Sequence, residues 1–208
     1  MIRTLFVHIP KNAGTSIYNC LKDSDKHNIP KWSRDAYLPH SYLLSRAKLY
    51  EFKPEIQFCV VRNPYDRFIS IYHHVQKRML GFCKKLKRRM LKYPHEIERL
   101  VSSFPSVNFL ATASFDDFVR KTLCEFDTKE IVHNYHHFMS QSSYIDRADI
   151  EIFRFEDLTL LEKRLSIKIP YLNVGGYDHD IKDLYYKDKK TKKIIEVFYE
   201  KDFENFKY

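Results

Sequence analysis

The chain has 208 residues, a length that fits one domain and can bury a hydrophobic core. Hydrophobic residues make up 44% and charged residues 30%, a balance that excludes collagen-like, mucin-like and wholly disordered chains. The 36 Lys and Arg exceed the 27 Asp and Glu and give a net charge of +9. This charge favours polyanionic partners, which include nucleic acid, anionic membranes, phosphorylated cofactors and acidic polysaccharides.

The cysteines and the N-terminus bear on the cellular compartment. Cys20, Cys59, Cys83 and Cys124 form no C-x-x-C pair, so we expect reduced thiols rather than a disulfide framework or a zinc site. The sequence has no run of 18 apolar residues, and Met1 leads directly into a strand-like segment instead of a signal peptide. We therefore expect a cytoplasmic protein without a transmembrane segment. A luminal domain trimmed from a longer protein is the alternative.

Short apolar runs alternate with helical patterns along the chain. The runs at 3–9 and 56–61 are typical of buried parallel strands, and a helical pattern follows each of them. This alternation predicts an α/β fold with a mostly parallel central sheet, organised as a single domain over residues 1–208. The other predicted elements are helices at 15–22, 41–48, from 65 onward, through most of 77–130 with Ser114 as an N-cap, at 156–164 and at 189–208, and a strand at 150–155.

The segment between the first strand and the first helix has the composition of an anion site. It reads Pro10-Lys11-Asn12-Ala13-Gly14-Thr15-Ser16. A loop that enters a helix N-terminus offers unpaired N–H groups and the positive end of the helix dipole. Gly14 permits close approach, Thr15 and Ser16 add hydroxyl donors, and Lys11 adds a cation. These groups predict a phosphate or sulfate site, whereas the simpler interpretation is a polar turn that caps a helix.

This loop differs from the standard P-loop. The lysine of a G-x-x-x-x-G-K-[ST] motif directly follows the last glycine, whereas Thr15 follows Gly14 here and the lysine lies upstream. The sequence also lacks a clear Walker B aspartate at the end of a strand, which a magnesium-dependent nucleotide enzyme usually needs. We therefore expect anion binding that does not require a metal.

A second candidate segment follows the strand at 56–61. Arg62 comes at the end of this strand, where an α/β sheet places its ligands, and Ser70 lies about two turns into the next helix. A guanidinium and a hydroxyl in these positions predict a second phosphate site. A structural ion pair between Arg62 and Asp66 is the alternative.

The two segments together resemble a known enzyme family. The order strand-PKNAGTS-helix, then strand-RNPYDRF-x-S-x-Y, is similar to sulfotransferases that use 3′-phosphoadenosine 5′-phosphosulfate (PAPS). The similarity is greatest to the carbohydrate branch, with heparan sulfate 2-O-sulfotransferases and their bacterial relatives. It extends to Gln141-Ser142-Ser143-Tyr144, to 153–158 and to 198–208, while the middle helical region matches least.

The resemblance implies a P-loop-like three-layer fold and in-line transfer of a sulfuryl group from PAPS to a hydroxyl. The product would be 3′-phosphoadenosine 5′-phosphate (PAP), and no metal would be required. Lys11 would also stabilise charge on the leaving oxygen, and Arg62 and Ser70 would hold the 3′-phosphate. The residues that would cradle the 5′-phosphosulfate are Lys11, Asn12, Ala13, Gly14, Thr15 and Ser16.

The resemblance also implies a catalytic base. In the family, a histidine between the two cofactor motifs commonly deprotonates the acceptor hydroxyl, and His40 matches in position and type. An imidazole with an ordinary pKa near 6.5 suits this task at neutral pH. Asp35 and His8 are weaker alternatives. A helix-capping or surface role ahead of the helix at 41–48 is the simpler interpretation of His40.

Two pairs of adjacent histidines carry no metal motif. Neighbouring side chains on a helix point apart, and neither His73-His74 nor His136-His137 belongs to an H-E-x-x-H or Cys/His pattern. We expect solvated or hydrogen-bonded surface residues. One member of each pair could instead face an acceptor cleft, because His73 and His74 follow Ser70 by about one turn.

Basic clusters leave the partner open. The run from Lys84 to Lys92 is expected to be a solvated helix face, or else an acceptor surface for an anionic glycan. The cluster from Lys187 to Lys193 is expected near the cofactor phosphates, by analogy with several sulfotransferases. No zinc finger or RNP-type motif is present, so we expect no nucleic-acid partner.

The resemblance leads to a carbohydrate as the expected acceptor, and the sequence does not indicate the oligomeric state. Two other functions stay open. One is a P-loop nucleotide kinase or phosphotransferase, although the absence of the G-K-[ST] motif argues against it. The other is a non-catalytic protein that binds polyanions or nucleic acid.

Overall fold

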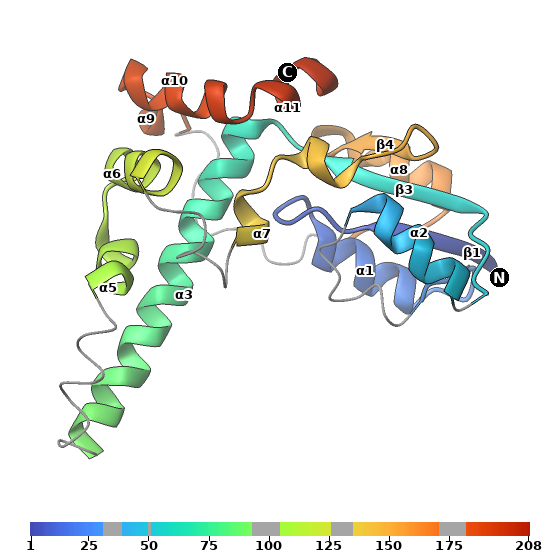
Figure 1. The fold of residues 1–208 in the computed structure, drawn as a ribbon. Helices are drawn as coiled ribbons and strands as arrows, with labels where there is room; N and C mark the ends of the chain where they lie inside the picture. The colour runs from blue at the N-terminus through green and yellow to red at the C-terminus, as the bar shows by residue number, and fades with distance from the viewer. Residues whose placement is uncertain (31–38, 50, 93–104, 126–134, 171–181) are drawn as a thin grey trace.

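In the computed structural model, four parallel strands of the described residues form the sheet (Figure 1). They are β1 (Ile2–Val7), β2 (His27–Asn28), β3 (Ile56–Val61) and β4 (Glu151–Arg154), in the order β2-β1-β3-β4. Thr4 lies opposite Ile56, and Phe58 lies opposite Glu151. The structure describes residues 1–30, 39–49, 51–92, 105–125, 135–170 and 182–208, so the alternative base Asp35 lies outside the described residues. The predicted α/β fold with a parallel sheet is confirmed.

Helices cover both faces of this sheet because alternate strand residues point in opposite directions. On one face, Phe6 and Phe58 pack against α1 (Gly14–Lys22) and α8 (Leu158–Leu165). On the other face, Val7 and Cys59 pack against Leu43 of α2 (His40–Leu49). β3 is therefore apolar along nearly its whole length, as a strand covered on both faces requires.

A helical region extends from the end of β3. The long helix α3 (Pro64–Lys92) runs away from the sheet, with α5 (Pro105–Thr112) and α6 (Phe115–Arg120) beside it (Figure 1). Its first turns pack in an aromatic core in which Phe68 contacts Phe115, Phe118 and Tyr199. The remaining described helices are a π-helical turn at Lys121–Glu125, α7 (Tyr135–Phe138), 3₁₀ turns at Gln141–Tyr144 and Phe155–Asp157, α9 (Lys182–Tyr185), α10 (Lys189–Phe198) and α11 (Glu200–Phe206).

Several element boundaries differ from the sequence-based predictions. The C-terminal segment is two helices rather than one, because the chain leaves helical geometry at Tyr199, whose buried side chain donates a hydrogen bond to Phe138 O at 2.9 Å. β2 was not predicted, since two residues carry no periodic pattern. The Ser114 cap is confirmed: its Oγ accepts from Asp117 N at 3.2 Å. Within the described ranges, no helix combines the length and apolarity needed to cross a bilayer.

Candidate functional site

The candidate site lies where the strand order changes direction. From β1 the chain crosses to β2 on one side and later to β3 on the other side of β1. α1 and α2 accordingly lie on opposite faces of the sheet, as their separate packing clusters show. In open parallel sheets this arrangement leaves a crevice at the carboxyl ends of the two central strands, where ligands bind. Lys11 follows β1 and Arg62 follows β3, so both lie at this crevice.

The backbone of the loop is held in an unusual conformation. Lys11 and Ala13 have φ values of 73° and 59°, in the left-handed region that residues with a side chain seldom adopt. Such backbone strain is concentrated at functional sites, where the surrounding structure maintains it. Ala13 is also the N-cap of α1 and supplies no side-chain hydrogen bond to it. The first N–H groups of α1 are thus oriented toward the loop without a side-chain cap, as an anion site requires.

The side-chain amide of Gln141 joins the two loops of the crevice. Gln141 is fully buried, and its Oε1 accepts from Asn12 Nδ2 at 2.7 Å and from Arg62 N at 2.9 Å. Its Nε2 donates to Arg62 O at 2.8 Å. Asn12 Nδ2 also donates to Val60 O at 2.8 Å. The Lys11–Ser16 loop is therefore fixed to the end of β3 through a buried amide more than a hundred residues away in sequence.

Asp202 of α11 in turn fixes the segment that carries Gln141. The carboxylate is fully buried and accepts from Gln141 N and Ser142 N, each at 2.8 Å. These two bonds satisfy the N–H groups at the start of the 3₁₀ turn at Gln141–Tyr144. Gln141 and Asp202 both belong to segments of the family resemblance, which assigned a role to neither of them. A polar residue in a sequence with a helical pattern does not by itself indicate burial.

A second buried group, Arg67, ties α3 to the same loop. Its guanidinium donates to Pro10 O at 3.1 Å, to Met139 O at 3.0 Å and to His137 O at 3.1 Å. The side chain is 1% exposed and lies over the ring of Tyr199, 5.8 Å from its centroid. Arg67 thus holds the backbone just before Lys11 and the segment 137–139 in one arrangement. The sequence motif contains Arg67, but no local pattern shows which carbonyls it reaches.

The electrostatic environment of Lys11 favours an anion. Burial, followed by the positive charges of Arg62 and Arg67, lowers the pKa of the Lys11 ammonium to about 8. Arg62 is 4% exposed, and its Nη1 donates to Lys11 O at 3.3 Å while its guanidinium stacks 4.3 Å from the ring centroid of Phe155. Three cationic side chains therefore lie within a region that is largely shielded from water. A bound polyanion relieves their mutual repulsion.

Ser70 and His40 occupy different places relative to this loop. Ser70 is half-buried on α3, eight residues after Arg62, and no hydrogen bond connects it to the Lys11 loop within the described part of the chain. His40 is the first residue of α2 and is fully buried. Its Nε2 donates to Gln57 Oε1 at 2.9 Å, and its Nδ1 lies 4.0 Å from Asp149 Oδ1.

The position of Gln57 places the His40 ring away from the crevice in this conformation. Gln57 precedes Arg62 by five residues, which corresponds to about 16 Å along an extended strand. Contact between the His40 imidazole and an acceptor near Lys11 therefore requires the ring to leave Gln57. His8, the weaker alternative for the base, is close to the loop: a Cβ atom built on Gly14 would lie 1.7 Å from His8 Nε2.

The paired histidines are not all at the surface as expected. His137 is 5% exposed, and its ring stacks on that of His74 with centroids 4.9 Å apart. The His73 side chain contacts a different residue, since its Nε2 lies 2.7 Å from the hydroxyl oxygen of Tyr185. Sequence alone could not show that segments 63 residues apart would bring His74 and His137 into contact. Among the described residues, no group of three or more His, Cys, Asp or Glu is placed to hold a metal ion.

The basic clusters lie on helices of the α3 region. Lys192 Nζ is 5.4 Å from the ring centroid of Tyr65, and Lys182 Nζ pairs with Asp66 at 3.0 Å, so both lie near the start of α3. The ion pair between Arg62 and Asp66 that was the alternative prediction is not found in the described structure, where Asp66 pairs with Lys182 instead. Lys84 and Lys85 are exposed in the outer half of α3.

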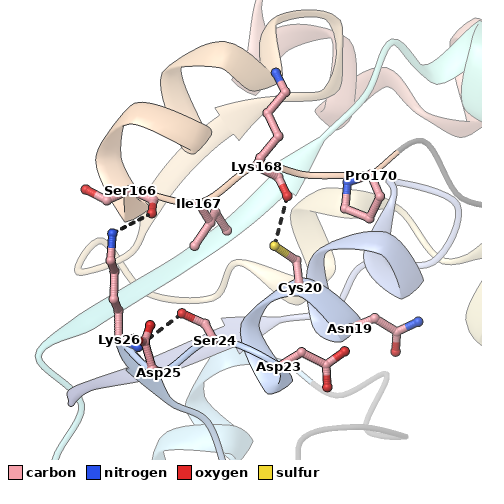
Figure 2. Close-up of a pocket in the computed structure, with 10 residues that line it drawn as sticks. All are labelled: Asn19, Cys20, Asp23, Ser24, Asp25, Lys26, Ser166, Ile167, Lys168 and Pro170. Carbon is pink, nitrogen blue, oxygen red and sulfur yellow. Dashed lines mark hydrogen bonds between the residues drawn. The ribbon is translucent and has the colours of Figure 1, made fainter.

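A surface cavity elsewhere contains none of the predicted site residues. It has a volume of about 620 Å³ and lies between the last turn of α1 and the segment after α8 (Figure 2). Figure 2 shows Cys20 Sγ donating to Lys168 O at 3.1 Å and Lys26 Nζ donating to Ser166 O at 3.2 Å across it. Its lining contains two aspartates, Asp23 and Asp25, and two lysines, Lys26 and Lys168, so it lacks the concentrated positive charge found at the crevice.

Comparison with known proteins yields one match. A sequence model described as the sulfotransferase family matches residues 3–164, which is more than half of the chain and includes both loops of the crevice. No curated protein and no solved structure matches the chain.

The contact between Gly14 and His8 leads to a testable prediction. We expect Gly14→Ala to lower the free energy of unfolding by about 1–3 kcal/mol, because the new methyl group displaces the buried His8 ring. His8→Ala removes that ring, so the additional loss from Gly14→Ala should shrink by about 1 kcal/mol or more in the double variant. Urea unfolding of the four proteins of this cycle measures the coupling. Additive losses would show that another atom limits the space at Gly14.

Proposed function

The chain belongs to the sulfotransferase family and is a sulfuryl-transferring enzyme, and we propose that it moves the sulfuryl group of PAPS to a hydroxyl of a carbohydrate. The observation that supports PAPS as donor is the crevice itself. It combines the first turn of α1, the Lys11 ammonium and the Arg62 guanidinium at the carboxyl ends of β1 and β3. Backbone N–H groups, an ammonium and a guanidinium form the donor set that phosphate and sulfate oxygens prefer.

In this proposal, each residue of the loop has a defined task. The segment Lys11–Ser16 binds the 5′-phosphosulfate through backbone N–H groups and the hydroxyls of Thr15 and Ser16. The Lys11 ammonium stabilises the negative charge that develops on the leaving phosphate oxygen. Arg62 and Ser70 bind the 3′-phosphate. PAPS supplies the sulfuryl group, and the buried Gln141 and Arg67 contacts keep the binding groups in place during transfer.

The proposed base is His40, as the family resemblance implies. With Nε2 donating to Gln57, Nδ1 is the nitrogen that can accept a proton, and Asp149 is positioned to stabilise the resulting imidazolium. This role requires the ring to reach the acceptor hydroxyl, so it depends on movement of α2 or of the side chain. A carbohydrate acceptor is consistent with the net charge of +9, which favours acidic polysaccharides among other polyanions.

Binding of the product PAP tests the donor. We expect calorimetry without magnesium to detect PAP binding that Arg62→Ala weakens about 10- to 100-fold, the effect of losing charged hydrogen bonds to a phosphate. AMP lacks the 3′-phosphate, so its affinity should respond little to the same substitution. Arg164→Ala is the matched control, because Arg164 pairs with Glu151 in the exposed last turn of α8. Preference for ATP with magnesium would replace the proposal with a phosphotransferase.

The lowered pKa of Lys11 predicts a pH dependence of PAP binding. In the free protein the ammonium loses its proton near pH 8, whereas bound phosphate groups favour the charged form and raise the pKa. PAP binding should therefore take up a proton around pH 8–9, and affinity should fall as pH rises from 7 to 10. Calorimetry in two buffers of different ionisation enthalpy measures this uptake. Lys11→Arg should abolish it, because a guanidinium stays charged throughout this range.

The proposed role of His40 can be separated from a structural role. If His40 is the base, His40→Ala lowers turnover of a glycan acceptor about 100- to 10,000-fold while PAP affinity stays near that of the wild type. Gln57→Ala is the companion variant, because it removes the half-buried hydrogen-bond partner of His40 but leaves the imidazole in place. A His40→Ala protein that loses stability yet keeps its turnover would assign the base to another residue.

A further inference from the structure

The outer half of α3 carries a dense group of positive charges. After Asp66 the helix contains no further acidic residue, and residues 77–92 include eight Lys or Arg. Those described as exposed are Lys77, Arg78, Lys84, Lys85, Arg88 and Lys92. Within the described residues, Lys77, Lys84, Lys85 and Arg88 pair with no carboxylate. Because like charges three or four residues apart destabilise a helix, this arrangement opposes folding of α3 until an anion binds to it.

Gly81 lies at the centre of this group. Residues three and four positions away are the neighbours of a residue on a helix surface, and for Gly81 these are Lys77, Arg78, Lys84 and Lys85. A Cβ atom built on Gly81 would meet no atom within 4 Å, and its φ is not positive, so neither packing nor backbone geometry requires a glycine. Glycine is less favourable than alanine inside a helix. It provides an open stretch of backbone, surrounded by four cations, that an anion can approach closely.

The charged face of α3 is opposite to the face that packs in the core. With 3.6 residues per turn, the six exposed cations lie within about 60° of Gly81 around the helix axis, whereas Tyr72 lies about 180° away. Tyr72 is buried, and its ring packs against Phe118 of α6. The charged face is therefore directed outward, and it extends for about 22 Å along a helix that runs away from the sheet (Figure 1). A flat anionic surface could contact its whole length.

Two exposed apolar side chains border the charged face. Leu80 and Phe82 are the sequence neighbours of Gly81, and they are 45% and 44% exposed. Each lies about 100° from Gly81 around the axis, so one of them is on either side of the cations. Apolar side chains next to lysines are typical of helices that lie on an anionic bilayer, where apolar groups enter the headgroup region and the ammonium groups stay at the phosphates.

A nucleic acid is the other common polyanion, and the surroundings of α3 do not suit it. A helix that enters the major groove brings the elements beside it close to the phosphates of the groove walls. α5 (Pro105–Thr112) packs along α3 and contains no Lys or Arg. Contact with a flat bilayer requires only the outward face of α3, which carries the cations.

We propose that the outer half of α3 binds the surface of a bilayer that contains anionic phospholipids, with lipid phosphates at the cations around Gly81. This contact is independent of the proposed sulfuryl transfer, because Arg67 and Ser70 belong to the first turns of the helix, more than two turns before Gly81. Binding is reversible, since surface charges and two apolar side chains give far less affinity than a helix inserted across the bilayer.

Sedimentation of the full chain with lipid vesicles tests this proposal. We expect binding to vesicles of equimolar phosphatidylcholine and phosphatidylserine, and much weaker binding to phosphatidylcholine alone. Added salt should weaken the binding, because it screens exposed charges. The double variant Lys84→Ala/Lys85→Ala removes two cations next to Gly81 and should lower the affinity for the anionic vesicles about 10- to 30-fold.

A pair of substitutions at Gly81 separates charge from shape. Gly81→Glu and Gly81→Gln introduce side chains of similar size, and only the first is charged. The new carboxylate would lie four residues from both Lys77 and Lys85, where it stabilises the helix but repels lipid phosphates. Gly81→Glu should therefore raise the melting temperature and weaken binding to anionic vesicles about fivefold or more. Gly81→Gln should bind within about twofold of the wild type.

A matched control removes the same charge elsewhere. Lys22 and Lys163 are exposed on α1 and α8, so Lys22→Ala/Lys163→Ala should bind anionic vesicles like the wild type. A loss equal to that of Lys84→Ala/Lys85→Ala would show that net charge, and not this face of α3, determines binding, and would overturn the proposal. PAP affinity should stay within about twofold of the wild type in all variants, because the substitutions are distant from the crevice.

Three other results would also contradict the proposal. They are equal binding to neutral and anionic vesicles, equal losses in Gly81→Glu and Gly81→Gln, and no vesicle binding at all. If vesicles fail but a double-stranded DNA or RNA binds in a salt-dependent way that Gly81→Glu weakens, the face belongs to a nucleic acid instead. Absence of PAP binding in the wild type would overturn the proposed function and leave the bilayer contact unaffected.

Discussion

The buried amide of Gln141 is the contact on which the candidate site depends. It accepts from Asn12 and from the backbone of Arg62 and donates back to Arg62, so it connects the segments that follow β1 and β3 beyond the last paired residues of these two strands, Val7 and Cys59. Asp202 holds the backbone of Gln141 from the far end of the chain. Gln141 is fully buried, and Asn12 and Arg62 are almost fully buried. Loss of either partner therefore leaves a buried polar group unsatisfied, which costs about 1–3 kcal/mol. This requirement explains why a C-terminal helix, outside the matched residues 3–164, is part of the frame that shapes the anion loop.

The same frame holds like charges close together. Burial, followed by the charges of Arg62 and Arg67, lowers the pKa of Lys11. Arg67 has no acidic partner among its hydrogen-bond acceptors, which are three backbone carbonyls. Electrostatic repulsion between these groups opposes folding, and the fixed carbonyl dipoles and the aromatic rings of Phe155 and Tyr199 offset part of it. The remaining repulsion among Lys11, Arg62 and Arg67 would be relieved when an anion binds between them. Relief of this repulsion would contribute to the binding free energy of a polyanionic donor at the crevice.

Much of the fold was predictable from sequence, whereas the contacts that shape the site were not. The strands at 56–61 and 150–155, the loop at 10–16 and the Ser114 cap all follow local rules of periodicity and capping, and the structure has them within one or two residues. The contacts of Gln141, Arg67 and Asp202 link segments separated by 60 to 130 residues, and their residue types occur equally often on solvated surfaces. His40 shows a related limit, because its place in the sequence matches the family base while its ring lies against Gln57. The break at Tyr199 depends on a buried hydroxyl that reaches Phe138, which no helical pattern encodes.

The position of α3 connects the crevice to the helical region of the fold. The helix begins directly after β3, so its first residues lie at the switch point between β1 and β3, where the donor would bind. Since α3 then runs away from the sheet, side chains at successive turns lie progressively farther from that point (Figure 1). Arg67 anchors the first turns to the loop, and His74 lies two turns later, stacked on His137. A single helix therefore sets both the distance and the direction between the Lys11 loop and the stacked rings of His74 and His137. The proposed in-line transfer would depend on such a fixed arrangement, because a displacement of the acceptor by about 1 Å is enough to reduce the rate strongly.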